Sequence, residues 1–500
     1  MRTIALIAIL SCLAACPAFA DVAGLIVPHH LLAEPMIRTA FEGIKDSNYS
    51  KVVILGPNHR NIGQKNVAAA GDLYIDLEHS ISALLPLVKE YFPRAKVVPI
   101  TFKYYTPPEE AEREGKKLAA VRGEKTLVIA SVDFSHHAAK PAAEANDKES
   151  IRAISSFDMG KIYSLKLDSP ASIYCLLSYL KIKGADQSIM LGNATAADFS
   201  SGADPADLTS YVTCYFAGDD SVVTILATGD VMLGRAVNMR MSRKGYEFPF
   251  RKTADLLKSS DITFINLECP IVANCAATNE GMRLSADPRS VKGLQYAGVD
   301  VVNLANNHIY DHGPAGRINT LKVLNDAGFQ VCDEHERAVV DIKGSRFSFL
   351  GYNCLSPRFD LEKARAGVRE ASSSSDVVVV ALHWGNEYTY NVSDRQRQIA
   401  RVMIDSGADL IIGNHPHYVQ ESEVYGKGFV TYSHGNFIFD QIWSKETQEG
   451  VVGRYTFYKD SLVKVEYIPI EIKNLCQPVV ANEETSRAIL SRMDEIFYSF

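Results

Sequence analysis

In the second half of the chain, residues that can bind divalent metals follow directly after strand-like apolar runs. Six runs end in acidic, amide or imidazole side chains, and these are Asp230; Glu268; Asn306, Asn307 and His308; His383; Asn414, His415 and His417; and His434 and Asn436. In α/β folds, loops at strand ends bring together groups that are distant in sequence. Carboxylate, amide and imidazole ligands suit manganese, zinc or iron better than a metal that prefers thiolates. The pattern therefore predicts a divalent metal site.

The ligand types are those of a two-metal centre. The carboxylate of Glu268 can bridge two ions, and His415 and His417 project to one side of an extended segment because they are two residues apart. Two ions roughly 3.5–4 Å apart share an activated water and hold the oxygen atoms around a phosphorus or carbonyl centre. A single Asp230 or Asn307 at a strand end is usually only a hydrogen-bonded loop residue, so the prediction depends on the coincidence of all six strand ends.

The first half of the chain shows a smaller version of the same pattern. Apolar runs lead into His29, into His59 and into the segment that contains His136. Three strand ends with histidines predict one cleft that holds a single metal ion. Buried histidines that only cap strand ends are the competing interpretation.

Both halves alternate strand-like and helix-like segments, which predicts an α/β fold class. Residues 51–55 and 126–130 are apolar and β-branched, as buried strands are. Residues 109–121 are helix-like, and so are residues 81–91, although Pro86 would kink this second helix. The predicted elements of the second half are strands at 301–304, 377–382 and 410–412 and helices at 315–327 and 395–405.

The length of 500 residues is too great for one ordinary core and indicates two domains. A turn-rich stretch at 217–221 separates them, with a strand on either side. Hydrophobic residues make up 47% and charged residues 22%, which is the balance of a folded soluble protein. The net charge of −7 and the lack of a basic run in the sequence argue against a nucleic-acid partner.

The N-terminus has the features of a secretion signal at 1–20. Arg2 precedes an apolar run at 4–13 that is too short to span a bilayer. A small-x-small cleavage site at 18–20 would release a soluble protein. The chain is therefore predicted to be exported to the periplasm or cell envelope.

A second processing route competes with simple secretion. Residues 13–16 resemble a bacterial lipobox, which would leave Cys16 lipidated and the protein tethered to the membrane. Pro17 is an awkward neighbour for that reaction, so simple secretion is favoured.

Seven cysteines follow the signal, and export to an oxidising compartment permits disulfides among them. Cys269 is close in sequence to Cys275, and Cys332 is close to Cys354. Disulfide pairing and buried free thiols remain alternatives.

Six motifs occur in order in the second half, and these are Gly229-Asp230-Val231-Met232-Leu233-Gly234-Arg235, Asn266-Leu267-Glu268-Cys269-Pro270, Leu304-Ala305-Asn306-Asn307-His308, His383-Trp384-Gly385, Gly413-Asn414-His415-Pro416-His417 and Tyr432-Ser433-His434-Gly435-Asn436-Phe437. They resemble the CapA family of poly-γ-glutamate capsule synthesis or export proteins, which is similar to calcineurin-type metallophosphoesterases. The resemblance covers residues 222–473 and implies a calcineurin-like α/β sandwich. The metal ligands that it implies are Asp230, Glu268, Asn307, His383, His415 and His417. It also implies that His308 protonates the leaving group and that Asp311 orients His308.

Two residues depart from the pattern of that family. Metallophosphoesterases usually have a histidine where this chain has Met232, which implies that one metal position is weaker or empty. His434 stands where the last motif usually has leucine. This extra imidazole is a metal ligand, a substrate contact or a tolerated substitution.

The histidines of the first half resemble those of the Memo-like family, the AmmeMemoRadiSam system protein B, which is similar in fold to class III extradiol dioxygenases. The resemblance covers residues 21–217 and rests on the segments around His29, His59 and His136. It implies that His29 and His59 bind the metal and that His136 lines the cleft. It leaves the third ligand open, and Asp198 is the candidate because it falls in the right region of the chain. Cys175 lies near the place where the family has a Cys-Gly pair.

Together these features predict an exported, metal-dependent hydrolase of the CapA type with a Memo-like accessory domain. The predicted order is a signal peptide at 1–20, a Memo-like domain at 21–217, a CapA-like domain at 222–473 and a tail at 474–500. The expected substrate is an anionic envelope polymer or its precursor, cleaved at a phosphoester or amide bond. The alternative is a factor that binds or exports the polymer through its metals without cleaving it, and oxygenase-like chemistry in the first domain is least favoured.

Overall fold

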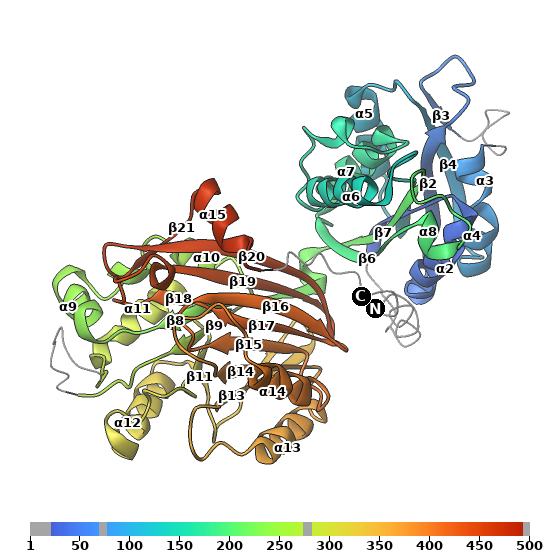
Figure 1. Ribbon diagram of the computed structural model, residues 1–500. Coiled ribbons are helices and arrows are strands. Elements are labelled where there is room, and N and C mark those ends of the chain that lie inside the picture. The colour runs from blue at the N-terminus through green and yellow to red at the C-terminus, as the bar shows by residue number, and fades with distance from the viewer. Residues whose placement is uncertain (1–21, 70–77, 274–282, 494–500) are drawn as a thin grey trace. The chain divides into compact units, whose positions relative to one another are not determined.

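The computed structural model describes residues 22–69, 78–273 and 283–493 (Figure 1). The chain divides between Val222 and Val223 into two units, and each is described by itself. The predicted signal at 1–20, including Cys16, lies outside the described residues. Among helices within the described ranges, none combines the length and apolar character needed to cross a membrane.

The first unit contains a seven-stranded sheet with the order β3-β4-β2-β5-β1-β7-β6. β4, β2, β5 and β1 run parallel, whereas β3, β7 and β6 pair antiparallel toward the two edges. The strands are β1 (Val22–Val27), β2 (Lys51–Asn58), β3 (Val67–Ala69), β4 (Lys96–Lys103), β5 (Thr126–Ser131), β6 (Gln187–Thr195) and β7 (Ser210–Ala217).

Helices cover both faces of this sheet. Figure 1 shows α5, α6 and α7 on one face and α2, α3 and α4 on the other. The helices are α2 (Glu34–Glu42), α3 (His79–Ser82), α4 (Leu85–Tyr91), α5 (Pro108–Ala120), α6 (Lys140–Ser155), α7 (Pro170–Lys183) and α8 (Ala196–Phe199). Apolar side chains of α5, α6 and α7 form one core with those of the central strands.

The predicted helix at 81–91 is two helices in the structure. α3 ends at Ser82, and α4 begins at Leu85 with Pro86 in its first turn. A proline is tolerated there because the first turn of a helix needs no backbone N–H donor. The expected kink at Pro86 is therefore a complete break.

The second unit contains two sheets. The first has the order β11-β10-β9-β8-β19-β20-β21, with β18 paired to β8, and the second has the order β12-β13-β14-β15-β17-β16. The strands of the first sheet are β8 (Val222–Val231), β9 (Ile262–Leu267), β10 (Val301–Asn303), β11 (Gln330–Cys332), β18 (Asn436–Ile438), β19 (Glu449–Tyr458), β20 (Ser461–Lys473) and β21 (Gln477–Val480). Those of the second sheet are β12 (Ala338–Ile342), β13 (Ser345–Asn353), β14 (Val377–His383), β15 (Leu410–Asn414), β16 (Val419–Tyr425) and β17 (Gly428–His434).

The two sheets pack face to face as a sandwich. Phe264 of β9 stacks on Phe349 of β13, with ring centroids 5.8 Å apart, and Phe347 contacts Phe457 of β19 at 5.5 Å. The helices lie on the outer faces and are α9 (Arg235–Lys244), α10 (Ala254–Leu257), α11 (Val291–Ala297), α12 (Gly313–Asp326), α13 (Leu361–Ser372) and α14 (Asp394–Ile404). The predicted α/β fold class, with a sandwich in the second half, is confirmed.

Residues after 473, which the sequence analysis separated as a tail, belong in part to this fold. β21 pairs antiparallel with β20 and extends the first sheet. The helix α15 (Glu483–Leu490) follows it, and Ile489 is buried in a small cluster with Val419 and Val451. The apolar positions of this segment were too few to reveal a strand and a helix in the sequence.

Four aspartates fix the relative positions of the parallel strands at their N-terminal ends. Each aspartate stands one residue before a strand, and its carboxylate accepts a backbone N–H from the preceding strand of the same sheet. The bonds are Thr224 to Asp261 at 2.8 Å, Thr263 to Asp300 at 2.8 Å, Arg346 to Asp376 at 2.7 Å and Val378 to Asp409 at 2.7 Å. We call these four residues the aspartate pins. They lie at the opposite strand ends from the candidate metal ligands.

One aspartate pin makes the stability of the protein depend on pH. Burial raises the pKa of Asp409 from 3.8 to about 7. The stability that its protonated form provides is therefore complete below the usual pKa and is lost as pH rises through about 7. Replacing Asp409 with Asn is expected to stabilise the protein at pH 8 by on the order of 1–2 kcal/mol, and by much less at pH 4. Urea unfolding at both pH values measures this difference.

The matched control for Asp409 is Asp376, which makes the equivalent bond at an exposed position. Asp376→Asn is expected to change stability by a similar small amount at the two pH values. Equal effects of Asp409→Asn at pH 4 and pH 8 would contradict the assignment.

Candidate metal centre

The parallel strands of both sheets in the second unit end at one buried polar cluster. Asp230 is the second-last residue of β8, Glu268 directly follows β9, and His383 is the last residue of β14. All three side chains are buried, as are those of His415 and His417 after β15. The sandwich thus brings five of the six predicted metal ligands to the same end of its two sheets. The sixth, Asn307, joins them through a 2.9 Å contact between its Oδ1 and the Nε2 of His383.

Glu268 is at the centre of this cluster. Its Oε1 lies 3.8 Å from the Nε2 of His417, 3.9 Å from that of His308 and 4.0 Å from that of His383. These separations are too long for hydrogen bonds. The separations to His417 and His383 match two ligands of one ion, because metal–nitrogen and metal–oxygen bonds of about 2.0–2.2 Å place neighbouring ligand atoms at such separations. In the part of the chain that the structure describes, His308 belongs to no such ligand group and pairs with Asp311 instead. Asp230, Glu268 and His417 form one group whose ligand atoms all lie within 4.8 Å of one another.

The surroundings of Glu268 fit a cation. The residue is 0% exposed, and neither carboxylate oxygen has a hydrogen-bond partner among the described residues. Burying an unpaired carboxylate costs several kcal/mol, so such groups normally pair with a cation or take up a proton. Burial and the neighbouring Asp230 raise the pKa of Glu268 well above its usual range. The donor set and this orphaned carboxylate therefore suit divalent metal ions.

The other ligand groups have the protonation states that metal binding requires. Burial and neighbouring imidazoles lower the pKa of His383 well below its usual value and that of His415 to about 4, so both rings are neutral. Burial alone would raise the pKa of Asp230, but the hydrogen bond and charge of His417 lower it below its usual range. Neutral imidazole and ionised carboxylate are the forms that bind metals.

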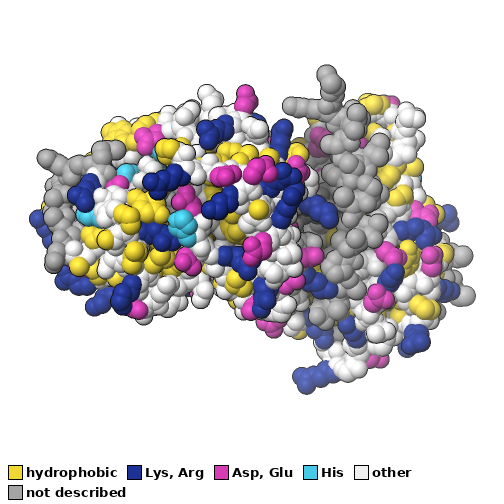
Figure 2. All heavy atoms as spheres, turned by 90° about the horizontal axis from the view of Figure 1, so that it is seen from below, with side chains coloured by type: hydrophobic (Ala, Val, Ile, Leu, Met, Phe, Trp, Pro, Cys, Tyr) yellow, Lys and Arg dark blue, Asp and Glu magenta, His cyan; other side chains and the backbone are white. Residues whose placement is uncertain are grey.

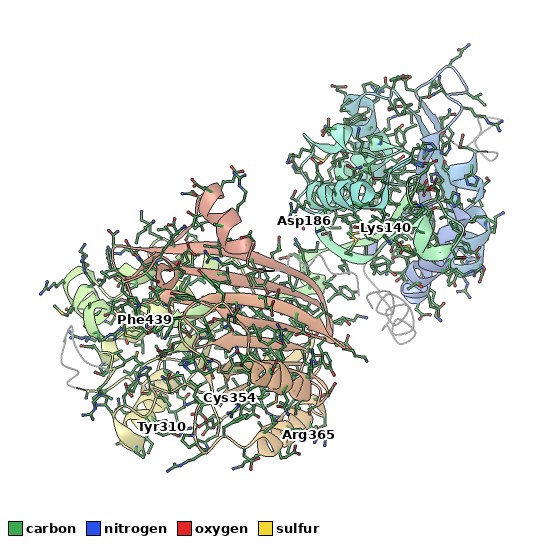
Figure 3. The ribbon with its side chains drawn as sticks, viewed as in Figure 1. Lys140, Asp186, Tyr310, Cys354, Arg365 and Phe439 are labelled. Carbon is green, nitrogen blue, oxygen red and sulfur yellow. The ribbon has the colours of Figure 1, made fainter. Side chains whose placement is uncertain are left out.

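Neighbouring amides hold these ligands in place. The Nδ1 of His417 lies 2.9 Å from the Oδ1 of Asn436, which leaves Nε2 facing Glu268. Asn266 donates to Asp230 at 2.8 Å. The ring of Phe439, labelled in Figure 3, lies 4.9 Å from the ring of His417 and packs against it. Such orienting contacts fix the ligand atom that faces the metal.

The backbone at two ligands is strained. His415 has φ of +98° and His417 has φ of +58°, in the left-handed region that residues with a side chain rarely adopt. Strain of this kind persists where the surrounding structure enforces it, and it gathers at functional sites.

His308 lies at the rim of the cluster with the predicted orienting partner. Its Nδ1 is 2.9 Å from the Oδ2 of Asp311. The carboxylate of Asp311 also accepts the backbone N–H of Leu284 at 2.6 Å, so it is itself held. The Nε2 of His308 therefore faces the cluster rather than Asp311.

His434 is not placed to bind a metal. Its Nε2 lies 2.8 Å from the hydroxyl of Tyr455 and its Nδ1 3.3 Å from the carbonyl oxygen of Gly413. Both ring nitrogens have protein partners. Of the three roles considered from the sequence, the tolerated substitution therefore fits. Met232 is also buried, and its sulfur accepts the backbone N–H of Gly234 at 3.0 Å.

Sequence reasoning missed Glu387. This residue groups with His415 and His417, with ligand atoms within 4.8 Å of one another. It stands in the loop four residues after His383, beyond the strand end itself. The short spacing from a candidate ligand was the only signal that the sequence offered.

The first unit contains a second cluster of histidines and acids. The Nε2 of His29 lies 3.2 Å from Asp168, and the rings of His29 and His59 are 5.1 Å apart. His29, His59 and Asp168 form one group that could hold a metal ion, and Asp133, His136 and Asp168 form another. Burial raises the pKa of Asp168 well above its usual range and lowers that of His29 to about 3. The histidines predicted for this cleft are thus brought together.

Asp198, the predicted third ligand, lies in neither group. Its carboxylate closes the N-terminus of α8 by accepting the N–H and hydroxyl of Thr195, and it pairs at 3.0 Å with Lys140, which is labelled in Figure 3. Both carboxylate oxygens of Asp198 are thus engaged, Oδ1 by Lys140 and Oδ2 by Thr195. Asp168 stands beside His29 instead, in the loop before α7, where no strand end marks it in the sequence.

The cysteines that the structure describes belong to neither cluster of candidate ligands. Cys332 and Cys354 are free and buried, so the disulfide considered between them is not formed. Cys275 lies outside the described residues, which leaves the other pairing without an outcome. Cys175 is a buried residue of α7 that packs into the core, and burial raises its pKa far above the usual range.

Each half of the chain is similar to a different family of known proteins. The family model "Bacterial capsule synthesis protein PGA_cap" matches residues 224–441, and the model "Memo-like protein" matches residues 72–213. The capsule biosynthesis protein CapA of Bacillus anthracis is 31% identical over 283 residues, which cover 51% of this chain and 69% of that protein.

Two further relatives support the same division. The PGA biosynthesis protein CapA of Bacillus subtilis is 31% identical over 296 residues, covering 55% of this chain and 78% of that protein. A MEMO1 family protein of Nitrosopumilus maritimus is 26% identical over 180 residues, covering 29% of this chain and 65% of that protein. Both predicted resemblances are thereby confirmed, and the chain belongs to the CapA-type family of bacterial capsule synthesis proteins and carries a Memo-like domain ahead of its CapA-type domain.

Proposed function

We propose that the second unit is a metal-dependent hydrolase that acts on an anionic polymer of the cell envelope, or on its precursor, after export of the protein. The observation that supports it most is the carboxylate of Glu268, which is fully buried, has no hydrogen-bond partner within the described ranges and is surrounded by imidazole nitrogens. Polyglutamate is the first substrate to test, because a relative is named a PGA biosynthesis protein.

The arrangement of side chains supports acid-assisted hydrolysis. Bound divalent ions polarise a phosphoryl or carbonyl centre and lower the pKa of water. Asp230, Glu268, Asn307, His383, His415 and His417 would hold them. The contact between Asp311 and the Nδ1 of His308 orients the ring, so that its Nε2 is the atom that would deliver a proton to the leaving group.

A cavity in the second unit is a candidate contact surface for the polymer, although none of the six candidate metal ligands lines it. Tyr310, two residues after His308, lines a cavity of about 1180 Å³ together with His335, Arg358 and Lys363. Its lining contains residues of both charges, and Figure 2 shows acidic and basic side chains interspersed on the face that it displays. The basic side chains of this lining, Arg337, Arg358 and Lys363, are the ones that could pair with carboxylates of a polymer.

An activity screen tests the hydrolase proposal. The purified full chain is stripped of metal, reloaded with manganese, zinc or iron, and given phosphomonoesters, phosphodiesters and γ-glutamyl amides. Turnover that requires metal and disappears in Asp230→Ala supports the proposal. Metal-dependent binding of polyglutamate without turnover would overturn it in favour of a non-catalytic polymer-binding or export factor.

For the first unit, the cluster of His29, His59 and Asp168 supports a separate, single cation. Asp168→Asn is expected to remove about one equivalent of metal from the loaded full chain, measured by elemental analysis. Asp198→Asn is the matched control and is expected to leave the metal content unchanged, because that carboxylate caps α8 and pairs with Lys140. The opposite result would restore Asp198 as the third ligand.

A further inference from the structure

The loop after His383 is held against the turn that carries the histidine ligands. Tyr388 donates its backbone N–H to the carbonyl oxygen of Pro416, between His415 and His417, at 2.9 Å. The ring of Tyr388 stacks on the ring of His417, with centroids 5.8 Å apart. Glu387, the residue before Tyr388, is thereby fixed beside the ligands by backbone and ring contacts together.

The distances around His417 place Glu387 as a ligand rather than a hydrogen-bond partner. The Nε2 of His417 lies 4.0 Å from the Oε1 of Glu387 and 3.8 Å from the Oε1 of Glu268. Neither separation is a hydrogen bond, and both suit ligand atoms that share a cation. The Nδ1 of His417 already faces Asn436. The ring thus presents its remaining nitrogen to two carboxylates with space for ions between them.

The cluster presents two adjacent ligand groups. Asp230 and Glu268 meet His417 in one group, and Glu387 and His415 meet His417 in the other. Three carboxylates converge on these two groups, and those of Asp230 and Glu268 are fully buried, so the cluster has acidic ligands for more than one divalent ion. The Nδ1 of buried His415 has no partner among the described residues, which leaves it available to the second group.

We propose that Glu387 is a metal ligand and completes a second cation position next to the one framed by Asp230 and Glu268. Met232, where a histidine would otherwise contribute, gives no hard ligand because its buried sulfur accepts the N–H of Gly234. Glu387 supplies a carboxylate from a different loop, so the centre holds two ions despite Met232. This inference rests on the metal centre of the proposed function and extends it.

Metal counting on the full chain tests the role of Glu387. Wild type, Glu387→Gln and Glu421→Gln are stripped, loaded with Mn²⁺ and measured by elemental analysis and equilibrium dialysis. Glu421 is the matched control because its side chain is 36% exposed, as is that of Glu387, and it pairs with Arg397 instead of a histidine. Glu387→Gln is expected to lose about one ion per chain, or to bind it roughly tenfold more weakly or worse, while Glu421→Gln matches wild type.

Electron paramagnetic resonance gives an independent readout. Two Mn²⁺ ions about 3.5–4 Å apart couple magnetically, and Glu387→Gln is expected to replace the coupled signal with that of isolated ions. Glu387→His restores a ligand of another type and is expected to recover the second ion with a preference shifted from manganese toward zinc. Equal melting temperatures of the metal-free proteins show that each variant folds.

The outcomes separate this inference from the proposed function. If Asp230→Ala lowers the metal content but Glu387→Gln keeps the wild-type ion count, affinity and coupled signal, the role of Glu387 is overturned and the metal centre stands. If neither variant changes the metal content of wild type, the metal centre itself is overturned.

Discussion

Replacing Glu268 with Gln is expected to stabilise the metal-free protein while it abolishes metal binding at the second unit. Gln keeps the shape of the side chain and removes a buried charge whose two oxygens have no partner among the described residues. The gain in the free energy of unfolding without metal is on the order of 1–3 kcal/mol near pH 8. Metal affinity is expected to fall by more than about 100-fold, since Glu268 contributes to the ligand set directly.

Denaturant unfolding in chelator and in excess Mn²⁺ measures both effects. Because burial raises the pKa of Glu268, metal-free wild type is expected to lose stability as pH rises, and the Gln variant lacks this loss. The matched control is Glu449→Gln, since Glu449 is equally buried but pairs with Arg492 at 2.5 Å and Lys445 at 3.4 Å. Removing a paired charge leaves its partners unmatched and is expected to destabilise the protein. If the metal-free Glu268→Gln protein is instead less stable than wild type, the carboxylate of Glu268 has a stabilising partner in solution.

Replacing His308 with Ala is expected to lower kcat by about 10²–10⁴-fold without changing the metal content. His308 lies at the rim, and its ring is oriented by Asp311, so its loss removes a proton donor rather than a buried ligand. The loss should depend on the leaving group. Substrates that release an alkoxide or amine need the proton and should be slowed most, whereas a nitrophenyl ester should be slowed little.

Steady-state kinetics on paired alkyl and nitrophenyl substrates, with elemental analysis of each preparation, measure this dependence. Asp311→Asn is expected to show a smaller loss with the same dependence on leaving group, because Asp311 acts through His308. A His308→Ala protein that loses metal, or that slows both substrates equally, would argue that the ring binds the cation and does not donate a proton.

The strand-end pattern predicted most of the candidate metal ligands of the second unit, for a physical reason. Apolar runs stop where parallel strands leave the sheet, and polar residues at those points, such as Asp230 and His383, are carried to one edge. Asp168 and Glu387 follow no strand directly, so only the folded loops show where they lie. Asp198 was chosen by its place in the chain, but a local capping box and Lys140 use its carboxylate.

The break before Pro86 and the elements β21 and α15 also show where prediction from the sequence fails. Pro86 marks an irregularity in the sequence, but whether a helix bends or restarts depends on packing against the sheet. β21 has a polar and weakly apolar sequence, and it becomes a strand because β20 offers an unpaired edge. Such elements are determined by their neighbours rather than by their own periodicity.

The aspartate pins have an evolutionary consequence. They anchor parallel strands at the ends away from the candidate metal ligands, through side-chain hydrogen bonds that do not involve the loops on the opposite rim. Insertions, deletions and new sequences in those loops can therefore accumulate without shifting the strands against one another. A scaffold whose strands are fixed at this end can in this way accept different loops at the other end. Chimeras that exchange whole rim loops between relatives are a practical route to new specificities.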